Sequence, residues 1–315
     1  MSCEPVFCAD SGAVAGVTSG DGVVYWYGEI AGYYLAYLAS LMVETSKKQR
    51  FAKHAARQVG LWIRECWTSE IATTRIYTGK SADWRNDYIF AFDLAMILKG
   101  LASARACGVD AWRGRQISEF IKSEFIDERG SLRAVIARTS NQPPDTWSTG
   151  IDGHQLKSAA GLIAWGKHSN DRTMYRLGQS TLQSLTRGGI CDWPHLPLHP
   201  RLYALEGVLL CGLAKPGLMA PVLTSILISI DIVTERTDVI AQLLRLALFA
   251  QMEGLLVDTL ALHLLDSIDA DGSVVFRVNQ IDEERNTWCA IFARQALHFY
   301  NEAICGRKVQ SGLCI

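Results

Sequence analysis

Seven residues that can move protons stand at or near the starts of apolar segments of this chain. They are Glu29, Asp87, His154, His199, Tyr203, Glu206 and Asp238. Carboxylates, imidazoles and phenols supply general acids and bases. If the apolar segments are helices whose N-terminal ends meet, these side chains converge on one mouth, so the set predicts acid–base chemistry on a bound ligand.

The reaction type stays open between two schemes. Hydrolysis can use two carboxylates placed on either side of the bond that is cleaved, and Glu29, Asp87, Glu206 and Asp238 form the pool. Elimination or epimerisation needs a base on a carbon acid and a cation on a carboxylate of the substrate. His154, His199 or Tyr203 could be that base, with Arg85 or Arg245 as the cation, and the mixed charge of the set slightly favours this second scheme or an anionic substrate.

A further set has the shape or charge to bind a ligand: Trp26, Trp84, Arg85, Trp147, Lys157, Trp193, Gln242, Arg245, Asn286 and Trp288. Indole rings can stack on the flat apolar faces of sugars, or they can simply plug the contacts between repeats. Lys157, Glu206 and Arg245 are isolated charges deep inside apolar segments. Burying an unpaired charge costs several kcal/mol, so each should meet a partner or a wet cavity.

Capping is the plainer role for several polar residues at the starts of segments. Asp152, Thr237, Asp238 and Asn286 are all good N-cap types, while Glu29 and Asp87 suit the first turn of a helix, where an acid faces the positive end of the dipole. Structural ion pairs between neighbouring helices are as good an expectation for Lys157 and Arg245 as a role in a site.

Several well-known site motifs are missing from the sequence. There is no Walker loop, no Gly-x-Gly-x-x-Gly after a strand and no His-Glu-x-x-His. His195 and His199 lie four residues apart, but Pro197 between them prevents a helical metal pair. We therefore expect neither a bound metal nor an organic cofactor.

A repeated phrase indicates the architecture that positions these residues. Ile126–Leu132 returns as Ile268–Val274, and each copy leads to Thr-Trp and an apolar segment. Looser copies surround Trp26, Trp84 and Trp193, and a helix-start signal near residue 237 marks one more. Six copies of roughly 50 residues predict six helical hairpins with decorated loops.

Helical spacing of apolar residues divides the chain into pairs of segments. The expected helices are 29–44, 48–66, 86–106, 111–126, 151–168, 172–187, 199–214, 218–231, 238–252, 255–268 and 287–304. The first member of each pair is the more apolar, which predicts an inner ring, and the amphipathic second members predict an outer ring. Short β-prone runs such as Val23–Tyr25 predict small hairpins in the loops.

Composition narrows the class of protein. The chain has 315 residues, 49% of them hydrophobic, and a net charge of −1, which gives ample core and argues against nucleic acid or a membrane as the main partner. Nine scattered cysteines without a Cys-x-x-Cys pair, and no signal-like start, predict reduced thiols in a cytoplasmic protein. We expect one domain, 1–315, with segment 1–25 as the candidate element that closes the ring; the sequence does not indicate the oligomeric state.

The whole pattern resembles the (α/α)6 toroid of the six-hairpin glycosidase superfamily. The resemblance rests on repeat number and helix polarity, with Tyr27–Tyr34 and Asn286–Cys289 similar in character to segments of that superfamily. It implies an all-α toroid whose funnel, at the N-terminal ends of the inner helices, holds the ligand. Members include glycoside hydrolases, polysaccharide lyases and sugar epimerases.

The resemblance therefore implies a carbohydrate-active enzyme that acts on a sugar or oligosaccharide. Two alternatives remain. One is a non-catalytic toroid that binds a glycan or a partner protein in a polysaccharide-making assembly. The other is an isoprenoid-cyclase-like toroid, which the absence of any Asp-Asp pair disfavours.

Overall fold

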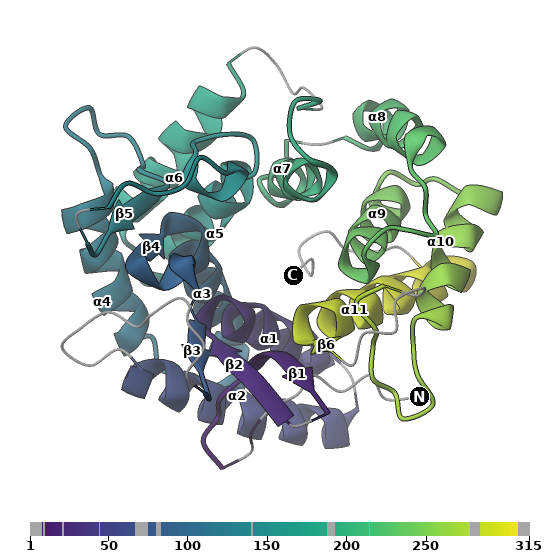
Figure 1. Ribbon diagram of the computed structural model, residues 1–315, viewed down its shortest axis with the longest axis horizontal. Coiled ribbons are helices and arrows are strands. Elements are labelled where there is room, and N and C mark those ends of the chain that lie inside the picture. The colour runs from purple at the N-terminus through teal and green to yellow at the C-terminus, as the bar shows by residue number, and fades with distance from the viewer. Residues whose placement is uncertain are drawn as a thin grey trace.

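Eleven α-helices in the described part of the chain form a ring of two layers (Figure 1). The computed structural model describes residues 8, 10–20, 22–43, 45–66, 75–79, 83–139, 141–187, 193–213, 215–277 and 284–307. The inner layer consists of α1 (Gly28–Ser40), α3 (Ala91–Ser103), α5 (Gln155–Ser169), α7 (Leu198–Leu210), α9 (Thr237–Phe249) and α11 (Thr287–Ile304). The outer layer consists of α2 (Ser46–Cys66), α4 (Trp112–Phe120), α6 (Arg172–Leu185), α8 (Pro216–Ser229) and α10 (Leu255–Asp266).

The two layers follow from the polarity of the helices. All thirteen residues of α9 are buried, as are ten consecutive residues of α1, because a helix that is apolar all round must be covered on every side. The outer helix α2 instead begins with a run of exposed charged residues. The expected inner and outer rings are confirmed.

Close contact between inner helices depends on glycine. Gly32 of α1 and Gly100 of α3 face each other, and a Cβ atom on either would collide with the backbone of the other helix. Gly207 of α7 meets the backbone of α5 at Leu156 in the same way. Interiors are packed to crystal-like density, so these glycines set how near the helices can lie.

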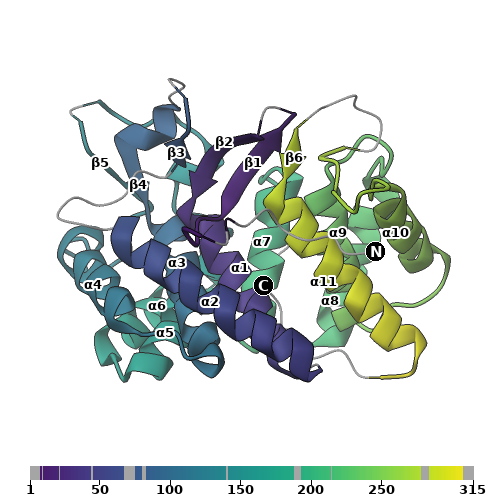
Figure 2. The same cartoon turned by 90° about the horizontal axis from the view of Figure 1, so that it is seen from below.

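All the strands lie at one end of the ring (Figure 2). One sheet has the order β3-β2-β1-β6 and contains β1 (Ala15–Ser19), β2 (Gly22–Tyr27), β3 (Arg75–Tyr77) and β6 (Arg285–Asn286). The other pairs β4 (Tyr88–Phe90) with β5 (Val135–Ala137). Strands β2, β4 and β6 run directly into α1, α3 and α11, so this is the end at which the inner helices begin. Strand β1 pairs with both β2 and β6 and thus joins the segments in front of α1 and α11.

Some expected helix boundaries were wrong: α5 begins at Gln155 and not at 151, and α7 ends at Leu210 and not at 214. The start of α3 matters most for the site. Helix α3 begins at Ala91 and not at residue 86, because Tyr88–Phe90 pairs with Val135–Ala137 as a strand. Arg85 and Asp87 therefore belong to a short 3₁₀ turn, Trp84–Asp87, ahead of the helix. The first turn of α3 carries Asp93 instead.

The repeated phrase folds in the same way twice. The amide of Asp127 donates to the carbonyl of Ser131 at 2.9 Å, and Asp269 donates to Ser273 at 2.9 Å. Gly130 and Gly272 adopt φ values of 77° and 87°, a left-handed conformation that glycine reaches without strain. A structural repeat therefore underlies the sequence repeat, although the loop copy at Gly189–Asp192 lies outside the described residues.

We compared the helices that the structure describes with the length and hydrophobicity of a bilayer-spanning helix. None of them combines the length and the hydrophobicity that a bilayer-spanning helix requires.

Candidate active site

A cavity of about 210 Å³ opens at the end of the ring where the inner helices begin. Its lining comes from segments far apart in the sequence: Tyr27, Glu29, Ile30, Arg75, Arg85, Phe90, Phe92, Asp93, Trp147, Ser148, His154, His199, Tyr203, Arg236, Phe276 and Trp288. We name its parts by their chemistry. The imidazole wall is His154 with His199, and the carboxyl wall is Glu29 with Asp93. We call the buried cluster of Lys157, Glu206 and Arg245, which lies beneath the lining and is not part of it, the floor.

The first histidine of the imidazole wall, His154, stands at the N-terminus of α5 and is fully buried. Its ring packs against those of Trp147 and Phe92, with centroids 5.1 and 6.2 Å away. Neither ring nitrogen has a hydrogen-bond partner among the described residues. Burial lowers the pKa of His154 to about 4, against a smaller opposing effect of Asp152. The imidazole is therefore uncharged at neutral pH.

The second histidine, His199, lies in the first turn of α7. Its Nδ1 atom is 2.8 Å from Oε1 of Gln242 and 3.7 Å from Oδ2 of Asp238, and its ring lies 4.4 Å from that of Tyr203. Burial lowers the pKa of His199 to about 4, although the Asp238 carboxylate acts in the opposite direction. One wall of the cavity thus carries two neutral imidazoles.

The carboxyl wall comes from the first turns of α1 and α3. The Tyr27 hydroxyl donates to Oδ2 of Asp93 at 3.5 Å. Burial raises the pKa of Glu29, and the neighbouring hydroxyls of Tyr27 and Tyr33 offset only part of the rise. Burial also raises the pKa of Asp93, and the nearby Glu29 charge adds to that rise. Both carboxyl groups therefore favour the protonated form more than an exposed acid does.

Three arginines surround the mouth of the cavity. Nη1 of Arg75 lies 2.6 Å from Oδ2 of Asp83, and Nη1 of Arg85 lies 3.3 Å from the same oxygen. Arg236 binds Asp238 with two bonds, from Nε at 3.0 Å and from Nη2 at 2.6 Å. These bonds hold the guanidinium planes in place before any ligand arrives.

The floor lies one turn deeper and is fully buried. Nζ of Lys157 is 2.7 Å from Oε2 of Glu206, and Arg245 donates to the other carboxylate oxygen. Burial alone would raise the pKa of Glu206, but the charges of Arg245 and Lys157 outweigh it and lower the pKa. The expectation that these isolated charges meet partners is confirmed, since they meet one another.

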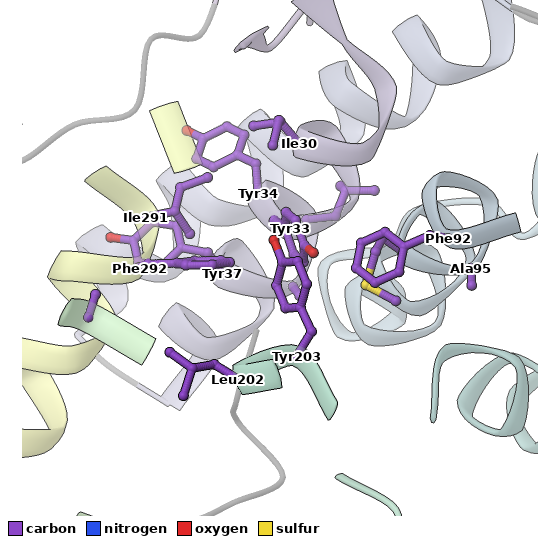
Figure 3. Close-up of a cluster of buried hydrophobic side chains, with 14 of the residues drawn as sticks. Ile30, Tyr33, Tyr34, Tyr37, Phe92, Ala95, Leu202, Tyr203, Ile291 and Phe292 are labelled. Carbon is purple, nitrogen blue, oxygen red and sulfur yellow. The ribbon is translucent and has the colours of Figure 1, made fainter. Parts of the chain in front are cut away.

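Aromatic rings enclose the lysine of the floor. Nζ of Lys157 lies 4.4 Å from the ring centroid of Tyr203, 4.8 Å from Tyr33 and 5.2 Å from Phe292. Figure 3 shows that Tyr203 from α7 points toward Tyr33 from α1, with Phe92 beside them. Cation–π attraction partly replaces the water that the ammonium group has lost.

The structure brings part of the expected set to the cavity surface: Glu29, Arg85, Trp147, His154, His199, Tyr203 and Trp288. A second group lies directly behind that surface. It consists of the three floor residues and two residues that bond to them or to the lining: Lys157, Glu206, Arg245, Gln242 and Asp238. Asn286 caps α11 through its side chain. The remaining four expected residues do not line the cavity either: Trp26, Trp84, Asp87 and Trp193.

These four lie elsewhere for local reasons. Asp87 is exposed, because the residues after it form β4 instead of continuing a helix. Trp84 packs on Tyr88 and Phe90 beside that strand. Trp193 is buried against Gly153, where a Cβ atom would strike the indole. Trp26 is half-buried in β2.

Three charged residues of the lining escaped the sequence analysis. Asp93 was placed too deep in α3 by the wrong helix start, although its position after an apolar strand was visible. Arg75 lies in a β3 strand of three residues, too short for a pattern, and Arg236 stands directly before α9. In the part of the chain that the structure describes, no group of three or more His, Cys, Asp or Glu side chains could hold a metal ion.

Comparison with known proteins identifies the fold. No family model matches the chain, and no curated protein sequence matches it. Solved structures do match. An α-amylase from Clostridium perfringens is 10% identical with a TM-score of 0.64, covering 92% of this chain and 93% of that one. A D-mannose isomerase is 11% identical with a TM-score of 0.64, covering 91% of each chain.

A third structure is cellobiose 2-epimerase from Bacillus thermoamylovorans, 12% identical with a TM-score of 0.61 over 94% of each chain. Identities this low show the fold alone. The chain therefore has the (α/α)6 toroid fold of these structures, as the repeat predicted.

Proposed function

We propose that this protein is a carbohydrate-active enzyme that isomerises or epimerises a sugar by moving a proton at the carbon beside its carbonyl group. One observation carries the proposal: two neutral histidines, His154 and His199, line a single cavity. A general base must be unprotonated at the working pH. An imidazole whose pKa is about 4 meets that condition throughout the neutral range.

The cavity residues suggest how the proton moves. A histidine nitrogen of the imidazole wall takes the proton from C2 of an open-chain aldose, and the C–H electrons form a C1–C2 double bond. The carbonyl oxygen becomes an enediolate oxygen. Return of the proton to C1, with loss of the O2 proton to O1, gives the ketose, whereas return to the other face of C2 gives the epimer.

Arg236 is placed to stabilise the charge that develops on the oxygen. Its guanidinium group lines the cavity and is held by Asp238, which itself lies 3.7 Å from Nδ1 of His199. Preorganised groups that stabilise a developing charge usually make the largest single contribution to catalysis. Glu29 and Asp93, whose pKa values are raised, can exchange hydrogen bonds with sugar hydroxyls. Trp147 and Trp288 offer flat faces for the ring.

The comparisons agree with this class of reaction. The structural neighbours include a D-mannose isomerase and a cellobiose 2-epimerase, both aligned over more than nine-tenths of the chain. This support is an analogy of fold. The argument from the two histidines does not depend on it.

Hydrolysis is the second candidate, because the carboxyl wall provides a pair of acids. Glu29 and Asp93 both line the cavity, and each has a raised pKa. A glycosidase uses one carboxyl group as general acid and another as base or nucleophile. Structural neighbours named as an α-amylase and as glycosidases favour keeping this candidate.

The two non-hydrolytic alternatives have less support. An isoprenoid-type cyclase needs an apolar cavity, whereas three arginines and two carboxylic acids line this one: Arg75, Arg85, Arg236, Glu29 and Asp93. A glycan binder without catalysis would keep the tryptophans but would not need the two neutral histidines.

Deuterium incorporation tests the proposal and separates the candidates. The protein is incubated in D₂O with D-mannose, D-glucose or cellobiose, and ¹H NMR follows the C2 proton and the products. We expect exchange at C2 in the wild type and a 10²- to 10⁴-fold slower rate, typical for loss of a general base, in His199→Asn. His195→Asn, which alters an exposed histidine outside the cavity lining, is the matched control and should keep the wild-type rate.

The other outcomes identify the alternatives. Release of monosaccharide from an oligosaccharide, lost in Glu29→Gln but kept in His199→Asn, would replace the proposal with hydrolysis. Saturable binding of sugars with neither exchange nor cleavage would leave a binding protein.

A further inference from the structure

We propose that the buried floor fixes the proton of His199 on Nδ1, through Gln242, and so leaves Nε2 as the basic atom of the imidazole wall. Gln242 is then a positioning residue, and Glu206 sets its orientation. The catalytic consequence rests on the proposed function, but the placement of the proton does not. The inference follows from three contacts, taken in order from the floor upward.

The first contact defines Glu206 as an acceptor. Its two carboxylate oxygens receive Lys157 at 2.7 Å and Arg245 on the other side. With two cations against it and no exposed surface, the carboxylate stays ionised. An ionised carboxylate has no hydrogen to donate.

The second contact orients the amide of Gln242. Its side-chain nitrogen lies 3.2 Å from Oε2 of Glu206. Because Glu206 can only accept, the NH₂ group of Gln242 must face it, and the reversed amide would set two oxygens against each other. The orientation is therefore dictated by the charge of the floor, and the carbonyl oxygen Oε1 faces the cavity side.

The third contact assigns the proton of His199. Oε1 of Gln242 lies 2.8 Å from Nδ1 of His199. A carbonyl oxygen only accepts, so Nδ1 must carry the hydrogen, and in a neutral imidazole the other nitrogen then holds the lone pair. Asp238, 3.7 Å from the same Nδ1 atom, favours the same tautomer.

The other groups around the imidazole do not reverse this assignment. Arg236 is bound to Asp238, Lys157 is bound to Glu206, and Tyr203 meets His199 by its ring. His154 offers a contrast within the same wall, since no described residue bonds either of its nitrogens. The two histidines thus differ: the tautomer of His199 is set by the protein, and that of His154 is left to the ligand.

Histidine ¹⁵N NMR of the ligand-free protein tests the inference directly. Two-bond ¹H–¹⁵N correlations report which ring nitrogen carries the proton, and His199→Asn assigns the His199 signals. We expect the Nδ1–H form in the wild type and a shift toward the Nε2–H form or a mixture in Gln242→Leu. Gln295→Leu is the matched control: it removes another buried glutamine bonded to Arg245 but without contact to His199, so the His199 signals should keep the wild-type pattern.

Steady-state kinetics provide a second test, because a change in kcat without a change in KM is not expected from simple loss of structure. On a substrate that the enzyme turns over, Gln242→Leu should lower kcat roughly tenfold to a hundredfold with KM nearly unchanged, because the base is misprotonated and binding is not altered. Gln242→Met repeats the test with an unbranched side chain should the leucine variant be unstable.

The outcomes separate the inference from the proposed function. An Nε2–H form in the wild type, or an unchanged His199 pattern in both folded Gln242 variants, would overturn the inference. An Nδ1–H form that responds to Gln242 supports it, even in a protein that turns over no sugar, and in that case only the proposed function fails.

Discussion

The buried ionisable groups of the walls and those of the floor differ in how their pKa values are shifted. On the walls, burial moves the pKa of His154 down and that of Glu29 up, so both groups favour their neutral forms. On the floor, Glu206 is just as deeply buried, yet its pKa is lowered and it stays charged. Removal from water acts on all of them, so burial alone does not decide the outcome.

The two glutamates show what does decide it. Glu206 touches two cations directly, whereas Glu29 has only the neutral hydroxyls of Tyr27 and Tyr33 nearby and feels Lys157 as a weaker charge. A direct ion pair compensates for lost hydration, and neutral donors compensate less. The floor is therefore a structural charge cluster, while the walls hold groups that can exchange protons with a ligand.

Removing the partner on the floor should give the largest effect. Glu206→Leu leaves Lys157 and Arg245 buried without the carboxylate that compensates them, and we expect a loss of about 3–5 kcal/mol in the free energy of unfolding. Urea denaturation followed by circular dichroism measures it. Glu128→Leu, on an exposed turn, is the control and should change stability by less than about 0.5 kcal/mol. A small loss in Glu206→Leu would mean that the aromatic rings around Lys157 suffice to hold the cations.

The sequence predicted the architecture well, because the architecture rests on patterns that repeat. Eleven helices, their inner and outer division, and the copied turns at Gly130 and Gly272 all follow from periodicity, which one chain displays many times. The start of α3 was wrong because the strand β4 depends on its partner β5, some 45 residues later, and pairing at that range leaves no local signature.

The site was only partly predictable, because some of its residues depend on contacts between segments that are distant in the sequence. His154, His199 and Glu29 were found because a polar residue at the start of an apolar helix stands out. Asp93 was lost with the wrong helix start, and Arg75 comes from a three-residue strand. The sequence also could not show that Lys157 and Arg245 both pair with Glu206, because the three residues lie on three different helices.

Acid should weaken the protein through the imidazole wall. His154 has a pKa of about 4 in the folded state, below the value of about 6.5 in an unfolded chain. Between these values the unfolded state binds more protons, so stability is lost as the pH falls through that range. At pH 5 this amounts to about 2 kcal/mol for one histidine.

His154→Leu removes that proton uptake and tests the size of the effect. The free energy of unfolding of the variant should fall by about 2 kcal/mol less than that of the wild type between pH 7.5 and pH 5. Urea unfolding at the two pH values measures the difference. Parallel losses in the two proteins would show that His154 is not held neutral by the fold.

The carboxyl wall should respond to pH with the opposite sign and the smallest effect. A carboxyl group whose pKa is raised in the folded state adds stability below its unfolded pKa, and this stability is lost as the pH rises through the folded value. Glu29→Gln keeps the size and the hydrogen-bonding atoms but cannot ionise, so it should match the wild type at pH 4 and exceed its stability at pH 8. The gain includes relief of Asp93, whose pKa the Glu29 charge helps to raise. Glu128→Gln, which alters an exposed acid, controls for the change of net charge. A variant less stable than the wild type at pH 8 would mean that Glu29 is ionised and paired like Glu206, and the contrast between wall and floor would then be lost.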